Sequence, residues 1–163
     1  MSKKSIYIFS RGEFIELPRE ELQNKAIIRI HSNRDKGWYD QDKYSNMLQV
    51  YFDDLTKENL KWYERWWCFH SSFIDIMKIS ASWSGQEHVA YPITYDTASE
   101  IIEFIKKNQK RDFVIHSEYG QSRSVAVGLF IKNNFGGILE NKTIKECERA
   151  NDWVLEVLEK AKD

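Results

Sequence analysis

The stretch Phe113-Val114-Ile115-His116-Ser117-Glu118-Tyr119-Gly120-Gln121-Ser122-Arg123-Ser124 decides how this chain folds. Its apolar beginning predicts a buried strand over Asp112–His116, because strands covered on both faces are almost continuously apolar. A mostly apolar helix is predicted over Ser124–Asn134, ended by Gly136-Gly137. A short polar loop therefore joins a buried strand to the start of a helix.

Working outward, strands and helices alternate along the chain. The patterns predict strands over 5–9, 26–31 and 47–52, and helices over 17–22, 55–69, 71–78, 94–107 and 143–160. The last of these helices should bury Ile144, Cys147, Val154, Val157 and Leu158. Residues 33–45 and 82–88 are predicted to be loops. This alternation predicts an α/β fold with three layers, in which helices flank a mainly parallel central sheet.

Thr94 and the residues after it give the clearest helix signal. Thr94 is a favoured N-cap residue. The apolar residues that follow recur at the spacing of one helix face, and they are Ala98, Ile101, Ile102 and Ile105. We therefore expect this helix to pack directly on the sheet.

Length and composition limit the function. A chain of 163 residues suits one domain over 1–163, and 42% hydrophobic residues are enough to form a core. The net charge of −1 argues against nucleic acid or an acidic membrane as the main partner. Cys68 and Cys147 imply no disulfide framework, so we expect a cytoplasmic protein.

The polar loop has the composition of an anion-binding site. A loop that runs from a strand into a helix points backbone N–H groups, and the positive end of the helix dipole, at one place. Gly120 relieves crowding in a tight turn, and the guanidinium of Arg123 can hold two oxygens of a phosphate. The backbone of Glu118, Tyr119, Gly120, Gln121 and Ser122, together with Arg123, is therefore predicted to bind a tetrahedral oxyanion.

This loop closely resembles the signature of the cysteine-dependent tyrosine and dual-specificity protein phosphatases, H-C-x5-R-[S/T]. Here it reads His116-Ser117, five residues, then Arg123-Ser124, so only the cysteine is missing. The resemblance covers about residues 90–160 and implies a protein tyrosine phosphatase-like fold. It also implies that position 117 is the nucleophile and that Ser124 assists breakdown of the phosphoenzyme. His116 would support the loop from behind.

Serine at position 117 should leave phosphate binding largely intact and remove most turnover, because a serine hydroxyl is much less acidic than a thiol. Two explanations are open. We favour an engineered Cys-to-Ser form, inactive or substrate-trapping, since the rest of the catalytic pattern is present. The alternative is a natural pseudophosphatase that binds a phosphorylated protein or small molecule without turnover.

Phosphate-ester cleavage also needs a proton donor for the leaving oxygen. By the resemblance, it should come from an aspartate that follows another parallel strand. Asp53 and Asp54 follow the strand predicted over 47–52. We favour Asp54 as the general acid and keep Asp53 as the second choice. Both could instead be turn residues that cap the next helix.

The segment 55–92 lengthens the chain between Asp54 and Ser117 relative to compact dual-specificity enzymes. It contains Trp62, Trp66, Trp67 and Trp83. We expect these aromatic residues to add to the core, although they could also form a wall beside the phosphate site. The scattered histidines have no ligand partners at metal-binding spacing, so we expect neither a metal nor a cofactor. The substrate should be a phosphorylated protein or a small phosphate monoester.

Overall fold

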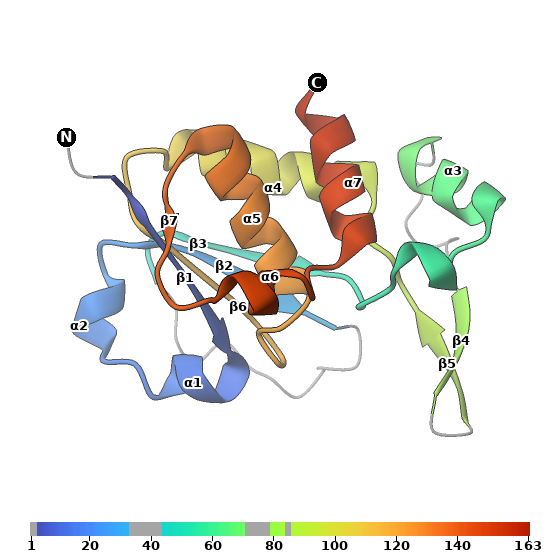
Figure 1. The fold of residues 1–163 in the computed structure, drawn as a ribbon, viewed down its shortest axis with the longest axis horizontal. Helices are drawn as coiled ribbons and strands as arrows, with labels where there is room; N and C mark the ends of the chain where they lie inside the picture. Colours follow the sequence, from blue (N-terminus) through green and yellow to red (C-terminus); the bar gives the residue numbers. More distant parts are fainter. Residues whose placement is uncertain (1–2, 33–43, 71–78, 84–85) are drawn as a thin grey trace.

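The computed structural model describes residues 3–32, 44–70, 79–83 and 86–163. Its main sheet has five strands in the order β3-β2-β6-β1-β7, and all neighbouring strands are parallel (Figure 1). The strands are β1 (Ser5–Ser10), β2 (Ala26–His31), β3 (Met47–Tyr51), β6 (Phe113–Ser117) and β7 (Ile138–Leu139). Four of them confirm predicted strands, and the sheet confirms the predicted parallel arrangement.

Helices cover both faces of this sheet. The helices α4 (Tyr95–Lys107), α5 (Arg123–Phe135) and α7 (Asp152–Lys162) lie over one face (Figure 1). The short helices α1 (Arg11–Ile15) and α2 (Arg19–Leu22) lie over the other. Alternate residues of β6 serve the two sides, because Ile115 packs in the large core and Val114 in the small one. The predicted three-layer α/β fold is thus confirmed.

Local signals explain two helix boundaries. The hydroxyl of Thr94 caps α4 by accepting a hydrogen bond from the Thr97 amide, and the predicted stripe of α4 is buried. At the end of α5, Gly136 has a φ of 77° and Gly137 one of 124°. These left-handed conformations favour glycine and end the helix where the sequence predicted.

The predicted helix over 143–160 is wrong as a single element. It is divided into α6 (Ile144–Cys147) and α7, because Asn151 has an extended backbone and caps α7 through its side chain. Ile144, expected in the core, is 87% exposed. An asparagine inside an apolar pattern was the signal for this break, since asparagine favours N-cap positions over helix interiors.

The predicted loop over 82–88 is also wrong. β4 (Ile79–Trp83) and β5 (Gln86–Ala90) pair as an antiparallel two-stranded sheet. Backbone hydrogen bonds hold such a pair together, so a polar sequence can form it without an apolar signature. The predicted helix over 71–78 and most of the predicted loop over 33–45 lie outside the described residues.

The tryptophan-rich segment is not simply added core. Its predicted helix over 55–69 becomes the 3₁₀-helix η1 (Lys57–Asn59) and α3 (Trp62–His70). Leu60 and Cys68 are buried, but Trp62, Trp66 and Trp67 are 74%, 53% and 44% exposed. In the nine-residue helix α3, Cys68 lies on the buried face, whereas the three tryptophans lie mainly on exposed faces. The side chain of Trp83 lies outside the described part of the chain.

Candidate active site

The candidate site lies at the carboxyl end of the parallel sheet, where α/β proteins commonly bind their ligands. Residues 118–122 connect the end of β6 to the start of α5. The loop is fastened to the neighbouring strand end, because the Arg11 amide donates to the Glu118 carbonyl oxygen over 3.3 Å. The Glu118 carboxylate lies 3.7 Å from the Arg11 guanidinium, which adds an ion pair between the same two residues.

Gly120 allows the loop to turn tightly against β1. Its φ is +64°, and a Cβ placed there would lie 2.6 Å from the carbonyl carbon of Phe9 and from the amide nitrogen of Ser10. Backbone atoms cannot move aside as a flexible side chain can. Only glycine fits this position without a shift of the loop.

Ser117 lies at the floor of the loop. Its hydroxyl oxygen is 2.8 Å from that of Ser124 and accepts a hydrogen bond from the Gly120 amide at 3.3 Å. Ser117 is 2% exposed and Ser124 is fully buried. The amide donor and the first turn of α5 therefore surround the side-chain oxygen at position 117 with positive potential.

Arg123 is held at the same place by the ends of two other strands. Its Nη1 atom donates to the carbonyl oxygen of Phe52 at 2.7 Å and to the hydroxyl of Ser32 at 2.9 Å. The side chain is nearly buried, at 5% exposure. These contacts fix the plane of the guanidinium, which is the property needed for directional binding of an oxyanion.

The two aspartates after β3 take different positions. Asp53 is buried and forms a bridge to Tyr91, accepting from its amide at 2.7 Å and donating its own amide to the Tyr91 carbonyl. Asp54 is exposed and accepts a 2.7 Å hydrogen bond from the hydroxyl of Ser122 in the loop. Geometry therefore separates a structural aspartate from one that contacts the loop over 118–122.

A small cavity of about 90 Å³ collects these groups. Its lining residues are Asp54, Ser117, Tyr119, Gln121, Ser122 and Arg123. One cavity thus brings Asp54 together with Ser117 and Arg123, which lie 63 positions or more further along the sequence. Asp53 and His116 do not line it. A carboxyl group, a nucleophile position and a guanidinium around one space could bind a phosphate and act on it.

His116 lies behind the cavity floor, on the other face of the sheet. Its ring stacks on Phe14 with centroids 3.8 Å apart, and its Nε2 atom accepts from Nε of Arg29 at 3.1 Å. Burial, with the charge of Arg29 adding to it, lowers the pKa of His116 well below its ordinary value. A neutral, buried imidazole can support the strand end, but it is not placed to remove a proton at position 117.

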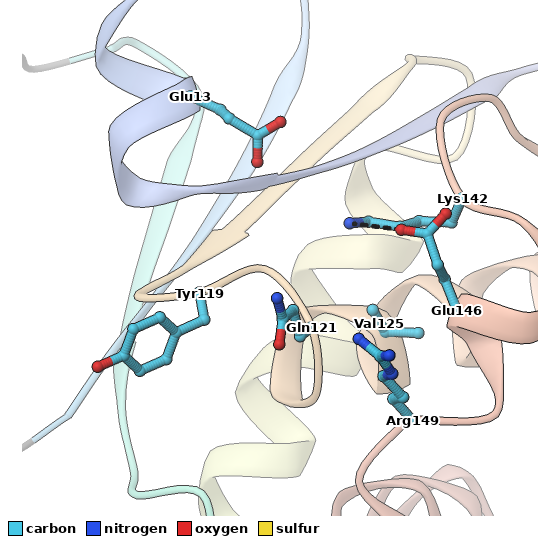
Figure 2. Close-up of a pocket in the computed structure, with 7 residues that line it drawn as sticks. All are labelled: Glu13, Tyr119, Gln121, Val125, Lys142, Glu146 and Arg149. Atoms are coloured by element: carbon cyan, nitrogen blue, oxygen red, sulfur yellow. Dashed lines mark ion pairs between the residues drawn. The ribbon is translucent and has the colours of Figure 1, made fainter.

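A second hollow of about 220 Å³ adjoins the loop (Figure 2). It shares Tyr119 and Gln121 with the small cavity and extends to the start of α5 and to the α6 region. Lys142 and Glu146, which both line it, form an ion pair of 3.7 Å, and Glu13 and Arg149 complete the charged lining (Figure 2). This hollow adds a charged space directly beside the small cavity.

Asn151 contacts the site, although no sequence pattern singled it out. It is 1% exposed, and its side-chain nitrogen donates to the Asp54 carboxylate at 2.6 Å. Its sequence signals were its place inside an apolar pattern and the acidic residue Asp152 directly after it, which are typical of a helix start. That signal predicts a cap, whereas a contact across 97 positions depends on the folded chain.

Comparisons of the chain with protein-family models, with curated proteins and with solved structures found no match. Among the described residues, no cluster of three or more histidine, cysteine, aspartate or glutamate side chains could hold a metal ion. Within the same part of the chain, no helix has both the length and the apolar character required to cross a membrane.

Proposed function

We propose that this chain is a phosphate-monoester-binding domain of the cysteine-dependent phosphatase type, with a protein tyrosine phosphatase-like fold and with Ser117 at the nucleophile position. One observation carries the proposal: Asp54, Ser117 and Arg123 line one cavity at the start of a helix. These are the acid, the nucleophile position and the oxyanion-binding residue that phosphate-ester cleavage requires. The signature-like loop supplies two of the three.

With cysteine at position 117, the reaction has two steps. The thiolate attacks phosphorus, the bond from phosphorus to the leaving oxygen breaks, and Asp54 gives that oxygen its proton. A water molecule then attacks the phosphocysteine, Asp54 takes the proton, and inorganic phosphate and the thiolate are released. Arg123 and the loop amides hold the non-bridging oxygens, and Ser124 donates a hydrogen bond to the departing sulfur.

With serine at position 117, the same cavity binds phosphate but does not turn it over. The hydroxyl is a poor nucleophile unless a base removes its proton. Its described hydrogen-bond partners are the Ser124 hydroxyl and the Gly120 amide, and neither is a base at neutral pH. The form with serine at position 117 should therefore be essentially inactive and still bind phosphate.

The alternative, a natural phosphate-binding protein without activity, has one observation in its favour. The Ser117 oxygen already has two hydrogen-bond partners, so the loop forms a complete structure with serine. In that case the ligand is a phosphorylated protein or a small phosphate monoester that is held and not cleaved.

Two measurements test the proposal. Calorimetric titration with inorganic phosphate should show binding that is lost in Arg123→Met and kept in Arg111→Met. Arg111 is a suitable control because it is an exposed arginine that contacts the carbonyl of Asn24 at 3.2 Å and does not line the cavity. Equal binding by both variants, or none by the parent protein, would contradict the proposed phosphate site.

The second measurement is hydrolysis of phenyl phosphate by Ser117→Cys, because the phenol that leaves this ester needs a proton. Turnover that falls strongly in the additional variant Asp54→Asn, and little in Asp53→Asn, supports a phosphatase. Phosphate binding without turnover in Ser117→Cys supports the non-catalytic alternative.

A cytoplasmic location belongs to the same proposal. Cys68 and Cys147 are both free thiols. A reducing compartment preserves free thiols, and a catalytic cysteine at position 117 would need the same conditions.

A further inference from the structure

The segment that carries Asp54 is fastened to the beginning of α7. Nδ2 of Asn151 donates to Oδ1 of Asp54 at 2.6 Å and to the carbonyl oxygen of Leu55 at 3.0 Å. One residue further along, the Asp152 carboxylate accepts from the Lys57 amide at 3.0 Å. The N-cap residue of α7 and the first residue of that helix thus hold the chain that follows β3.

Asn151 is itself fixed by the helix that it caps. Its Oδ1 atom accepts from the Val154 amide at 3.0 Å, which leaves Nδ2 directed at Asp54. Its own amide donates to the carbonyl oxygen of Ser122 at 3.2 Å. The same buried asparagine therefore contacts both the proposed acid and the end of the phosphate loop. It fixes the position of the acid relative to the loop.

Both described side-chain donors to Asp54 reach the same carboxyl oxygen. Oδ1 accepts from Nδ2 of Asn151 at 2.6 Å and from the Ser122 hydroxyl at 2.7 Å. An oxygen that accepts two hydrogen bonds is a poor position for a proton, because the proton would meet both donors. A proton on this carboxyl group therefore belongs on Oδ2.

We infer that Asn151 is a positioning residue: with Ser122 it holds Oδ1 of Asp54, so that the proton for the leaving group is carried and delivered by Oδ2. This inference rests on the proposed function. Positioning of this kind matters most where the leaving oxygen needs its proton in the transition state. A leaving group that departs readily as an anion gains little from it.

The test uses the Ser117→Cys protein and two esters. Phenyl phosphate releases a phenol with a pKa of about 10, like that of tyrosine, whereas para-nitrophenyl phosphate releases a much more acidic phenol. Asn151→Ser keeps an oxygen that can cap α7 but removes the donor to Asp54. We expect kcat/KM for phenyl phosphate, which reports transfer of the phosphoryl group and not the later breakdown of the phosphoenzyme, to fall about 10- to 100-fold, the effect of losing one hydrogen bond to a charged group.

For para-nitrophenyl phosphate, kcat/KM should stay within about threefold, since little protonation of that leaving group is needed. Asp152→Ala is the matched control, because it removes the adjacent contact to Lys57 without touching the Asp54 carboxyl. It should affect both esters alike. Ser122→Ala removes the second donor to Oδ1 and provides an independent variant with the same expected preference if Asn151→Ser does not fold.

The outcomes separate this inference from the function on which it rests. A selective loss on phenyl phosphate in Asn151→Ser, or in Ser122→Ala where Asn151→Ser does not fold, supports the inference, whereas a folded Asn151→Ser protein without that selectivity overturns it. An active Ser117→Cys enzyme in which both variants lower the two rates equally, or change neither, overturns the inference and leaves the proposed function standing. A Ser117→Cys protein that hydrolyses neither ester overturns both.

Discussion

The side-chain oxygens of Ser117 and Ser124 lie 2.8 Å apart in the buried floor of the loop. Ser117 ends β6 and Ser124 stands in the first turn of α5, so the hydrogen bond joins the two elements on either side of the loop. In the proposed reaction this contact places a donor next to the sulfur that must leave phosphorus in the second step.

Ser124→Ala in the Ser117→Cys background should therefore slow breakdown of the phosphoenzyme more than its formation. Loss of a buried hydrogen bond worth about 1–3 kcal/mol corresponds to a fall in kcat of about 5- to 150-fold. Rapid-quench measurement should show an initial burst of released phenol that persists while the steady rate falls. An equal loss of burst rate and steady rate would contradict this role.

Gly120→Ala should disrupt the loop. The new methyl group would lie 2.6 Å from backbone atoms of Phe9 and Ser10, and its backbone would have a φ of +64°. The left-handed conformation alone costs about 1–2 kcal/mol. We expect weaker phosphate binding and a free energy of unfolding lower by more than that, measured by urea denaturation.

Gly12→Ala is the matched control for this substitution. Gly12 lies in α1, and the nearest atom to its added Cβ is the Ser10 hydroxyl at 4.0 Å. Alanine in a helix should raise the free energy of unfolding by about 0.5–1 kcal/mol. Similar effects of the two alanines would show that the close approach at Gly120 has no energetic importance.

The double variant with Ser117→Cys and Cys147→Ser has two thiols, at positions 68 and 117. These thiols should be alkylated at very different rates. Burial raises the pKa of Cys68 to about 12, and the Glu64 charge adds to the shift. The thiol at position 117 should accept a hydrogen bond from the Gly120 amide, and it faces the start of α5. Both features should lower its pKa into the range of about 3.5–7.5. Alkylation by iodoacetate at mildly acidic pH should label position 117 and spare Cys68, as read by peptide mass spectrometry.

Phosphate provides the control for that experiment. An excess of inorganic phosphate should protect position 117 and leave any slow labelling of Cys68 unchanged. A thiol at position 117 that reacts only at alkaline pH would contradict the electrostatic description of the loop.

His116 should make the fold sensitive to mild acid. Its pKa is lowered well below 6.5 in the folded chain by burial and by Arg29, but it should return to about 6.5 on unfolding. Below that pH the unfolded chain binds a proton that the folded chain does not. The free energy of unfolding should therefore fall as pH decreases from about 6.5, by up to about 1.4 kcal/mol per pH unit.

Urea denaturation at several pH values from neutral to mildly acidic measures this slope. His116→Gln, which cannot titrate, isolates the contribution of His116. A slope identical to that of the parent protein would show that the ring is not buried neutral. In the folded protein, the ring resonances of His116 should stay unchanged over the same pH range.

Local sequence patterns correctly predicted elements whose burial follows one regular pattern from end to end. β6 is buried at every position, and its apolar run was readable without knowledge of its neighbours. The stripe of α4 and its Thr94 cap are equally local. Prediction failed where a single polar residue interrupts a pattern, as Asn151 does between α6 and α7, or where backbone pairing forms structure without an apolar signature, as in β4 and β5.

Two elements left too little sequence signal to be predicted. β7 has two residues and joins the sheet by pairing with β1. α1 buries only Phe14, and its start depends on reciprocal hydrogen bonds between Ser10 and Glu13. Short elements such as these gain their stability from the surface onto which they pack.

The loop from Ser117 to Ser124 could be recognised from its residues, because a strand, a turn with glycine and a helix start follow one another along the chain. The different surroundings of Asp53 and Asp54 could not be predicted in this way, and the sequence favoured Asp54 as the acid only through the family resemblance. Adjacent residues with the same side chain differ only in what they meet, and those partners, Tyr91 for Asp53 and Ser122 and Asn151 for Asp54, come from distant segments. The loop is formed by consecutive residues, so the sequence alone indicates it. The orientation of the Asp54 carboxyl group follows from contacts that exist only after the sheet and α7 have packed.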